Sequence, residues 1–229
     1  MALALRGNVD SRITVNYRVD VDELESVLPD ALVAREVDDG VGVGGVCLGV
    51  VRGARPGGVP RLLGVNAESA LHRVAVEWDG GKGCYVVRRD VDSTLGAIAG
   101  RALLPGALGR ARTTVDVDGE RFYARVDCDT EFVRLDAREA DGLPGDSVFG
   151  SPGDVLEYYG ETEVAYAGRP RTFERSICSI EGGEVAALDP DLARSSFFEG
   201  LGGEFDSAVV TRDARQEIRR GLGVVGGRR

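Results

Sequence analysis

Two residue types that carry much of enzyme chemistry occur once each in this chain of 229 residues, lysine as Lys82 and histidine as His72. A side-chain amine nucleophile would have to be Lys82, and an imidazole acid or base would have to be His72. Both lie in the segment from Leu71 to Val91. Any chemistry that needs a side-chain amine or an imidazole is therefore confined to this segment.

This segment has the pattern of two apolar strands joined by the glycine turn Asp79–Gly83. If Trp78 pairs with Cys84, His72 lies opposite Asp90 on one face. A neighbouring carboxylate raises the pKa of an imidazole where it outweighs burial, and such a pair could act as acid or base. The alternative is a buried hydrogen-bonded pair that only pins the hairpin. A register slip of one residue would place the two side chains on opposite faces.

Further polar residues extend this candidate site. Glu68 could enter a cavity as a general acid or an orienting group, or it could be a solvated loop residue. Arg88 and Arg89 point to opposite faces of one strand, and an inward arginine would bind a carboxylate in a bidentate manner. The same hairpin register places Arg73 and Tyr85 together on one face. We expect catalytic roles for His72, Asp90 and Glu68 and ligand binding by Arg73, Arg88 and Tyr85, against the alternative of ordinary salt bridges.

Several familiar motifs are absent or misplaced. Gly40–Gly45 matches the letters of a dinucleotide fingerprint, but it leads into a strand-like run, where the motif requires a helix. These glycines fit sheet curvature or close backbone contact better. The chain has neither a Gly-x-Ser-x-Gly elbow nor a phosphate loop. With one histidine and scattered cysteines we expect no cofactor and no transition metal, while a carboxylate-only site for a hard cation stays open.

The composition narrows the partners. The net charge is −10, from 28 basic and 38 acidic residues, which disfavours nucleic acids and anionic membrane surfaces. An acidic, lysine-poor surface fits a halophilic protein, and it fits a GC-rich genome equally well. The four cysteines are widely spaced, as expected for buried free thiols in a reducing cytoplasm. The sequence shows neither a signal peptide nor an apolar run long enough to span a bilayer, so we expect a cytoplasmic protein.

Many short valine-rich runs separated by Gly, Asp and Pro predict a β-rich protein. The expected strands cover residues 12–19, 32–37, 41–51, 71–78, 84–91, 112–117, 121–126, 131–135, 163–166, 172–180 and 205–211. Short helices are expected from Asp20 or Asp22 to Pro29, from Asp92 or Ser93 to Leu103, over 152–159, and from Asp189 through Phe197. We predict one domain over residues 1–229, with an antiparallel sheet that is strongly curved or closed and a frayed tail over 219–229.

Short patterns across nearly the whole chain resemble a known family. They are Asn16–Val19, Leu28–Asp30, Gly64–Trp78, Gly83–Ser93 and Gly100–Gly106. Together they resemble the YqjF-like branch of the acetoacetate decarboxylase-like superfamily, a domain of unknown function. The resemblance implies an α+β, mainly β fold, in which a curved antiparallel sheet closes into a cone around a small-molecule cavity and the helices lie outside.

The resemblance does not extend to the chemistry best known for that superfamily. Acetoacetate decarboxylases use a Schiff-base lysine in a Gly-x-Pro-Lys context, activated by a neighbouring lysine. The matching segment here is Leu103–Ala107, which contains no lysine. Lys82 falls in a hairpin turn, where an exposed ammonium stays charged. The resemblance therefore implies the fold without the activity.

Two functions remain open. One is a cavity protein that binds a small organic molecule without turnover. The other is a lysine-independent lyase or hydrolase that uses acid–base chemistry on a small carboxylated or carbonyl substrate. Both expect a small-molecule partner, and both leave homo-oligomerisation open. An enclosed pocket holding two or more of the candidate side chains would favour the enzyme.

Overall fold

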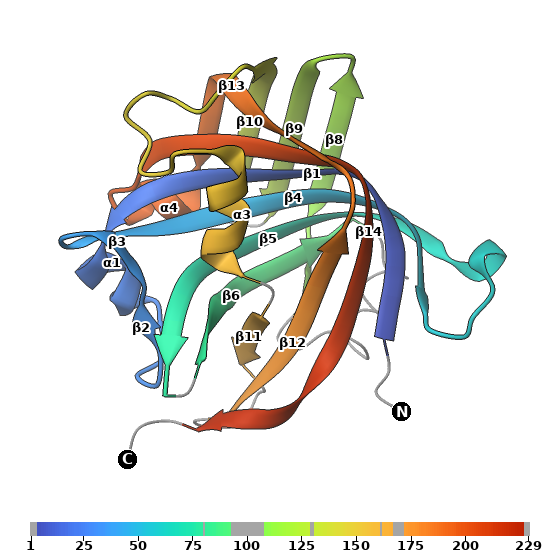
Figure 1. Cartoon of the computed structure of the whole chain (residues 1–229), viewed down its shortest axis with the longest axis horizontal. Coiled ribbons are helices and arrows are strands. Elements are labelled where there is room, and N and C mark those ends of the chain that lie inside the picture. The colour runs from blue at the N-terminus through green and yellow to red at the C-terminus, as the bar shows by residue number, and fades with distance from the viewer. Residues whose placement is uncertain are drawn as a thin grey trace.

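The computed structural model describes residues 4–79, 81–92, 108–128, 131–160, 162–166 and 172–226. All of the strands in these ranges belong to one 14-stranded sheet (Figure 1). The helices described are short and pack against the sheet without entering the strand order (Figure 1).

In chain order the elements are β1 (Ala4–Asp20), α1 (Val21–Ser26), β2 (Val33–Ala34), β3 (Glu36–Asp38), β4 (Val41–Pro56), the 3-10 turn η1 (Arg61–Leu63), β5 (Val65–Trp78), β6 (Gly81–Val91), β7 (Leu108–Arg110), β8 (Arg112–Asp118), β9 (Arg121–Cys128), β10 (Glu131–Ala140), α3 (Pro152–Tyr159), β11 (Thr162–Tyr166), β12 (Thr172–Glu181), β13 (Glu184–Ser195), α4 (Ser196–Gly200) and β14 (Glu204–Gly226).

Seven of these strands close into a ring, which we call the seven-strand ring. Its order is β1-β4-β5-β6-β11-β12-β14, and β14 pairs back onto β1. Most neighbours are antiparallel, but β6 and β11 run parallel and, among the described residues, are joined by the pairs Glu163↔Cys84 and Val164↔Tyr85. The predicted fold class, a mainly β protein with a curved, closed sheet and short outer helices, is confirmed. The parallel pairings were not predicted.

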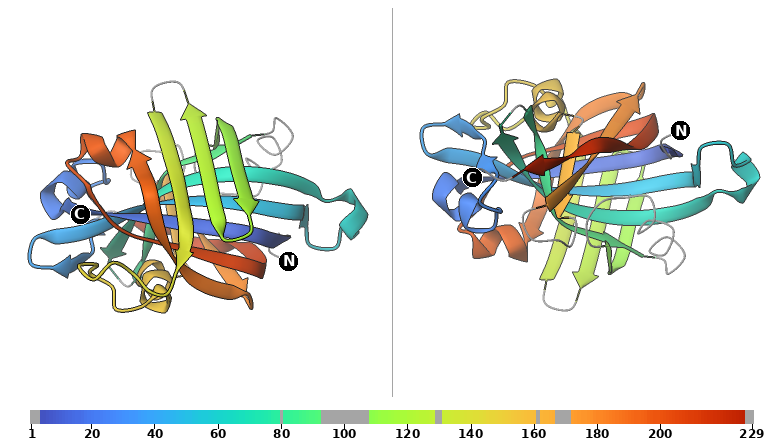
Figure 2. Two further views of the ribbon diagram at one scale, coloured as in Figure 1. Left: turned by 90° about the horizontal axis from the view of Figure 1, so that it is seen from above. Right: turned by 90° about the horizontal axis from the view of Figure 1, so that it is seen from below.

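The first half of β14 carries a second run of strands away from the ring. It pairs with β13, followed by β10, β9 and β8. Figure 2 shows that β8, β9 and β10 cross over β1, β4 and β5. The layer between them is the main apolar core, and its largest fully buried members include Ile13, Leu48, Phe122, Leu135, Leu188 and Phe198. One face of β1, β4 and β5 therefore meets this core, and the other face meets the interior of the ring.

The glycine run in β4 permits close packing on both faces. A Cβ atom on Gly44 would collide with the Phe198 ring, and one on Gly45 would collide with the Tyr159 hydroxyl. Phe198 belongs to the main core, whereas Tyr159 belongs to α3. The expected close contact to the backbone is therefore present, and no helix follows these glycines.

Three local predictions differ from the structure. Trp78 pairs with Gly81 and His72 with Arg88, because the turn is shorter than assumed and an irregularity between His72 and Arg73 shifts the register. The helix expected from Asp189 is mostly β13, and only α4 at its end is helical. The tail expected to fray from residue 219 is strand up to Gly226, paired with β12. The helix expected after Asp92 lies outside the described residues.

Other predictions are confirmed. Helix α1 follows Asp20, whose side chain accepts a hydrogen bond from the Asp22 amide, and α3 covers the predicted residues 152–159. Cys47, Cys84 and Cys178 are buried free thiols, as predicted, whereas Cys128 is a free thiol that is only half-buried.

None of the helices in the described ranges is long and apolar enough to cross a membrane.

Candidate functional site

The interior of the seven-strand ring holds a small cavity whose wall combines apolar residues with several polar and charged side chains. Its volume is about 40 Å³, and its lining includes Arg12, Cys47, Ser69, Arg89, Glu163 and Gln216. These residues come from β1, β4, β5, β6, β11 and β14. Their side chains point inward because the neighbouring residues on the same strands face the main core, as Ile13 and Leu48 do.

Arg89 and Glu163 form a buried ion pair in this cavity. One terminal nitrogen of Arg89 donates to Glu163 Oε2 at 2.6 Å, and the Ser176 hydroxyl lies 3.4 Å from the same oxygen. Burial alone would raise the pKa of Glu163, but the charges of Arg89 and Arg12 outweigh it and hold that pKa below its usual value. Glu163 is therefore a carboxylate, and not a proton donor, at neutral pH.

Arg12 lies between two thiols. Its Nε donates to Cys47 Sγ at 2.9 Å, and its Nη1 lies 3.8 Å from Cys178 Sγ. The side chain of Gln216 also donates to Cys178 Sγ, at 3.1 Å. Burial raises the pKa of Cys178, as expected for an apolar site. Cys47 differs, because the positive charges of Arg12 and Arg73 overcome burial and lower its pKa.

A third guanidinium group, that of Arg73, completes the polar interior. It lies 3.6 Å from the centre of the Tyr159 ring, and its Nη2 donates to Thr14 Oγ1 at 3.4 Å. The Tyr159 hydroxyl in turn donates to Asn16 Oδ1 at 2.9 Å. Through Tyr159, helix α3 thus contacts the inner face of β1, β4 and β5. Figure 1 shows the helix lying across these strands.

Two of these buried guanidinium groups are incompletely hydrogen-bonded. The Nε atoms of Arg73 and Arg89 find no partner among the described residues, although the two residues are only 4% and 8% exposed. An unpaired buried donor costs about 1–3 kcal/mol, and such groups in proteins usually have a reason to exist. Among the described residues of the interior, three arginines outnumber one carboxylate, that of Glu163. Arg12 and Arg89 line the cavity, and Arg73 lies close enough for its charge to act on Glu163. This arrangement can accept an anion.

Of the six predicted site residues, Arg73 lies in the ring interior. The other five lie away from the cavity. His72, Tyr85, Arg88 and Asp90 lie on the opposite side of the sheet, toward the main core. Asp90 binds Arg88, at 2.5 Å and 3.2 Å, and forms no hydrogen bond to His72. Of the two adjacent arginines, the sequence analysis selected Arg88 for ligand binding, whereas the structure places Arg89 at the ring cavity.

His72 is fully enclosed by apolar and aromatic groups. Its ring centre lies 5.6 Å from that of Phe197 and 6.2 Å from that of Phe198, and neither of its nitrogens has a partner in the described ranges. Burial lowers the pKa of His72 to about 4, and the nearby Asp90 offsets this only in part. Burial therefore outweighs the carboxylate, and the imidazole is neutral at pH 7.

Glu68 and Lys82 also lie apart from the cavity. Glu68 Oε2 accepts a hydrogen bond from the Val115 amide of β8 at 3.0 Å, and burial raises the pKa of this carboxyl group. Lys82 is exposed at the start of β6, next to the β5–β6 turn. Its ammonium group is thus on the surface, as predicted.

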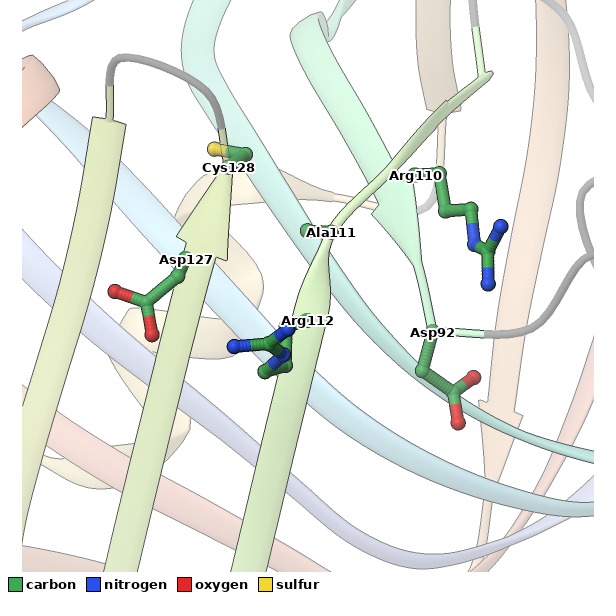
Figure 3. A pocket seen from close by; sticks show the side chains of 6 residues that line it. All are labelled: Asp92, Arg110, Ala111, Arg112, Asp127 and Cys128. Carbon is green, nitrogen blue, oxygen red and sulfur yellow. The ribbon is translucent and has the colours of Figure 1, made fainter.

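A second, wider hollow of about 680 Å³ lies where β6, β7, β8 and β9 meet, lined by Asp92, Arg110, Ala111, Arg112, Asp127 and Cys128. In Figure 3, Arg110 and Asp92 point to one side of the β7–β8 segment and Arg112 points to the other, toward β9. Both arginines are exposed. Water can satisfy their hydrogen bonds, so this hollow lacks the buried guanidinium groups with unpaired Nε atoms that distinguish the ring interior. The described residues contain no cluster of three or more potential metal ligands.

No local pattern in the sequence indicated Arg12, Cys47, Glu163 or Gln216 as site residues. Arg12 falls on the polar face of a predicted strand, so it does not stand out from the pattern. Glu163 was assigned only to a short strand. Each lies on a different strand, and only the closure of the ring brings them together. The alternation along β1, with Ile13 inward to the core, was the one signal that could have placed Arg12 on the opposite face.

Comparison with known proteins gives a clear result for the fold. No family model matches the chain, and no curated protein matches it in sequence. Solved structures do match over nearly its whole length. An acetoacetate decarboxylase-like enzyme from Sphingomonas wittichii RW1 has a TM-score of 0.67 at 17% identity, with 97% of this chain and 92% of that chain covered. The fold is that of the acetoacetate decarboxylase-like proteins.

Two further structures agree. The enduracididine biosynthesis enzyme MppR complexed with pyruvate has a TM-score of 0.62 at 14% identity, covering 99% of this chain and 91% of its own. The acetoacetate decarboxylase from Legionella pneumophila has a TM-score of 0.62 at 12% identity, covering 98% of this chain and 88% of its own. At these identities the likeness establishes the acetoacetate decarboxylase-like fold and leaves the activity to be argued from the site.

Proposed function

We propose that this protein binds a small organic anion, a carboxylate, inside the seven-strand ring, and that it does so without forming a Schiff base. The observation that carries the proposal is the pair of buried guanidinium groups, Arg73 and Arg89, whose Nε atoms lack partners among the described residues. A carboxylate accepts two parallel N–H bonds from one arginine, so it is the ligand that such groups fit best.

The size of the cavity limits the ligand. A volume of about 40 Å³ accommodates a few water molecules or a group of only a few heavy atoms. The structure of MppR with pyruvate is a relevant parallel, because it shows that one protein of this fold holds a small oxo acid. We therefore propose acids of two or three carbon atoms as the ligand class.

The absence of Schiff-base chemistry is part of the proposal. The sequence contains one lysine, and Lys82 is exposed at the β5–β6 turn. A solvated ammonium group retains its proton at neutral pH and does not attack a ketone. On this basis, and on the sequence patterns that resemble the YqjF-like branch, we propose that the chain is a YqjF-like protein rather than a decarboxylase. The enzymatic alternative, acid–base turnover by His72, Asp90 and Glu68, stays a prediction, although no contact among the described residues favours it.

Calorimetric titration with acetate tests the binding. Acetate should bind the wild-type protein, and Arg89→Lys should weaken it about tenfold or more, because lysine keeps the charge opposite Glu163 but loses the planar fork. Arg121→Lys is the matched control, since Arg121 forms an exposed ion pair with Asp136 and should bind acetate as the wild type does. Equal acetate affinity in Arg89→Lys, or no binding to the wild type, would refute the proposed site.

Borohydride reduction in the presence of pyruvate tests whether the protein forms a Schiff base. A Schiff base between pyruvate and Lys82 would be reduced to a stable adduct, which mass spectrometry detects. We expect the intact mass of the protein to stay unchanged. A pyruvyl adduct on Lys82 would show that the protein uses amine chemistry after all.

A further inference from the structure

Cys47 occupies a different environment from the other three cysteines. Its sulfur lies in the ring cavity, 2.9 Å from the Nε of Arg12. Cys84, Cys128 and Cys178 all have raised pKa values because burial dominates their surroundings. For Cys47 the charges of Arg12 and Arg73 reverse this effect, and its pKa falls below the usual value. An ionised thiol is the reactive form of cysteine.

The same cavity contains a second feature that points to a ligand. Arg89 lines it with an Nε atom that no described residue accepts from, and the residue is only 8% exposed. An ionised Cys47 would give the described part of the interior two anionic groups, Cys47 and Glu163, facing three arginines. One positive charge is left over, which a monocarboxylate would balance.

One residue of the cavity wall also borders a groove on the surface. Gln216 lines both the cavity and an outer groove of about 400 Å³, whose wall includes Arg6, Arg55 and Arg215 together with Glu181 and Glu217. Arg6 is paired with Glu217, so the groove carries charges of both signs.

We infer that Cys47 is a nucleophilic thiolate, and that the ring cavity takes a small oxo acid whose carbonyl carbon this sulfur attacks. The inference rests on the proposed function, because the carboxylate of the oxo acid must be held by Arg89. The sulfur lone pair forms the S–C bond, the π pair of the C=O bond moves to oxygen, and that oxygen takes a proton from water. The product is a thiohemiacetal or thiohemiketal, and its formation is reversible without any oxidant or reductant.

Alkylation of the native protein with iodoacetate at pH 7 tests the thiolate. The sulfur displaces iodide, and peptide mapping by mass spectrometry shows which of the four cysteines carries the carboxymethyl group. We expect Cys47 to be labelled before Cys128, although Cys128 is the more exposed of the two. The ratio of iodoacetate to iodoacetamide labelling should also be higher at Cys47 than at Cys128, because the cavity attracts an anion. Labelling of Cys128 first would overturn the inference.

The pH profile of labelling needs no variant. An ordinary thiol gains about tenfold in thiolate per pH unit below its pKa of about 8.5, whereas Cys47 should already be near its limiting rate at pH 7.

Arg12→Gln should slow labelling of Cys47 at pH 7 by about tenfold or more, with circular dichroism as the check on folding. Cys128→Ser is the control and should leave the Cys47 rate unchanged. A tenfold rise per pH unit for wild-type Cys47 would refute the ionised thiol.

Protection experiments separate this inference from the proposed function. Acetate should slow labelling of Cys47 by occupying the cavity, and glyoxylate at equal occupancy should slow it more, because it also engages the sulfur. If acetate binds but glyoxylate protects no better, the covalent step is wrong and the proposed function stands. If Cys47 is labelled selectively but acetate neither binds nor protects, the proposed function fails, and the oxo-acid ligand fails with it.

Discussion

Replacing His72 with leucine should make the stability of the protein less sensitive to acid between pH 6.5 and pH 4. His72 is 1% exposed and lies against Phe197 and Phe198, with both nitrogens unpaired in the described ranges. The folded protein therefore holds a neutral imidazole, and protonation would place a charge in the main core. Leucine at this position cannot take up a proton, so the acid-dependent cost disappears.

The structure sets the size and the sign of the effect. Burial lowers the pKa of His72 from 6.5 to about 4, a difference of about 2.5 units. At about 1.4 kcal/mol per unit this corresponds to roughly 3 kcal/mol. Between these pH values the unfolded chain binds a proton that the folded chain does not, so the free energy of unfolding rises with pH in this window. The contribution is complete above pH 6.5 and is lost as the pH falls through 4.

Urea unfolding from pH 7.5 to pH 4.5 measures the effect. The difference in unfolding free energy between wild type and His72→Leu should change by about 2–3 kcal/mol across this range, while other titrating groups cancel in the difference. The single histidine also gives an unambiguous NMR signal, whose chemical shift should titrate well below pH 6.5. A measured pKa of 6.5 or higher would refute the reasoning, because it would mean that the carboxylate of Asp90 outweighs burial.

Other predictions follow from packing and charge in the ring. Gly44→Ala should cost about 1–3 kcal/mol of stability in thermal or urea unfolding, because its Cβ would meet the Phe198 ring, whereas Gly142→Ala, with open space around its Cβ, should change stability by less than about 0.5 kcal/mol. Glu163→Gln should tighten acetate binding in calorimetry, since it removes the carboxylate that competes for the arginines, and it should lower the melting temperature. Gln216→Ala should speed iodoacetate labelling of Cys47 severalfold by opening the cavity wall beside the outer groove, and an unchanged rate would show that anions enter elsewhere.

Local signals made part of the fold predictable from the sequence. Helix α3 was placed correctly because its boundaries are local, with Ser151 as N-cap, proline in the first turn and Gly160 at the C-terminal end. The helix expected from Asp189 was wrong because β13 gains its hydrogen bonds from β10 and β14, which are distant in sequence. Tertiary pairing thus overrode the local pattern there.

The candidate site was less predictable, for a geometric reason. The hairpin register depended on a turn of unknown length, and an irregularity beside His72 altered it again. As a result Asp90 was assigned to His72, whereas it pairs with Arg88. The polar cluster around Arg12 and Glu163 unites residues some 150 positions apart, as the sequence numbers show, and no short-range pattern encodes such a meeting.

The junction between β6 and β11 links occupancy of the cavity to the integrity of the ring. In the part of the chain that the structure describes, two residue pairs join these strands through the backbone, and the Arg89–Glu163 bond spans the same junction. A ligand that draws Arg89 away from Glu163 would weaken the β6–β11 junction, which has the fewest described backbone pairs in the ring. Ligand binding and separation of β6 from β11 would then be thermodynamically coupled, so that each lowers the free-energy cost of the other.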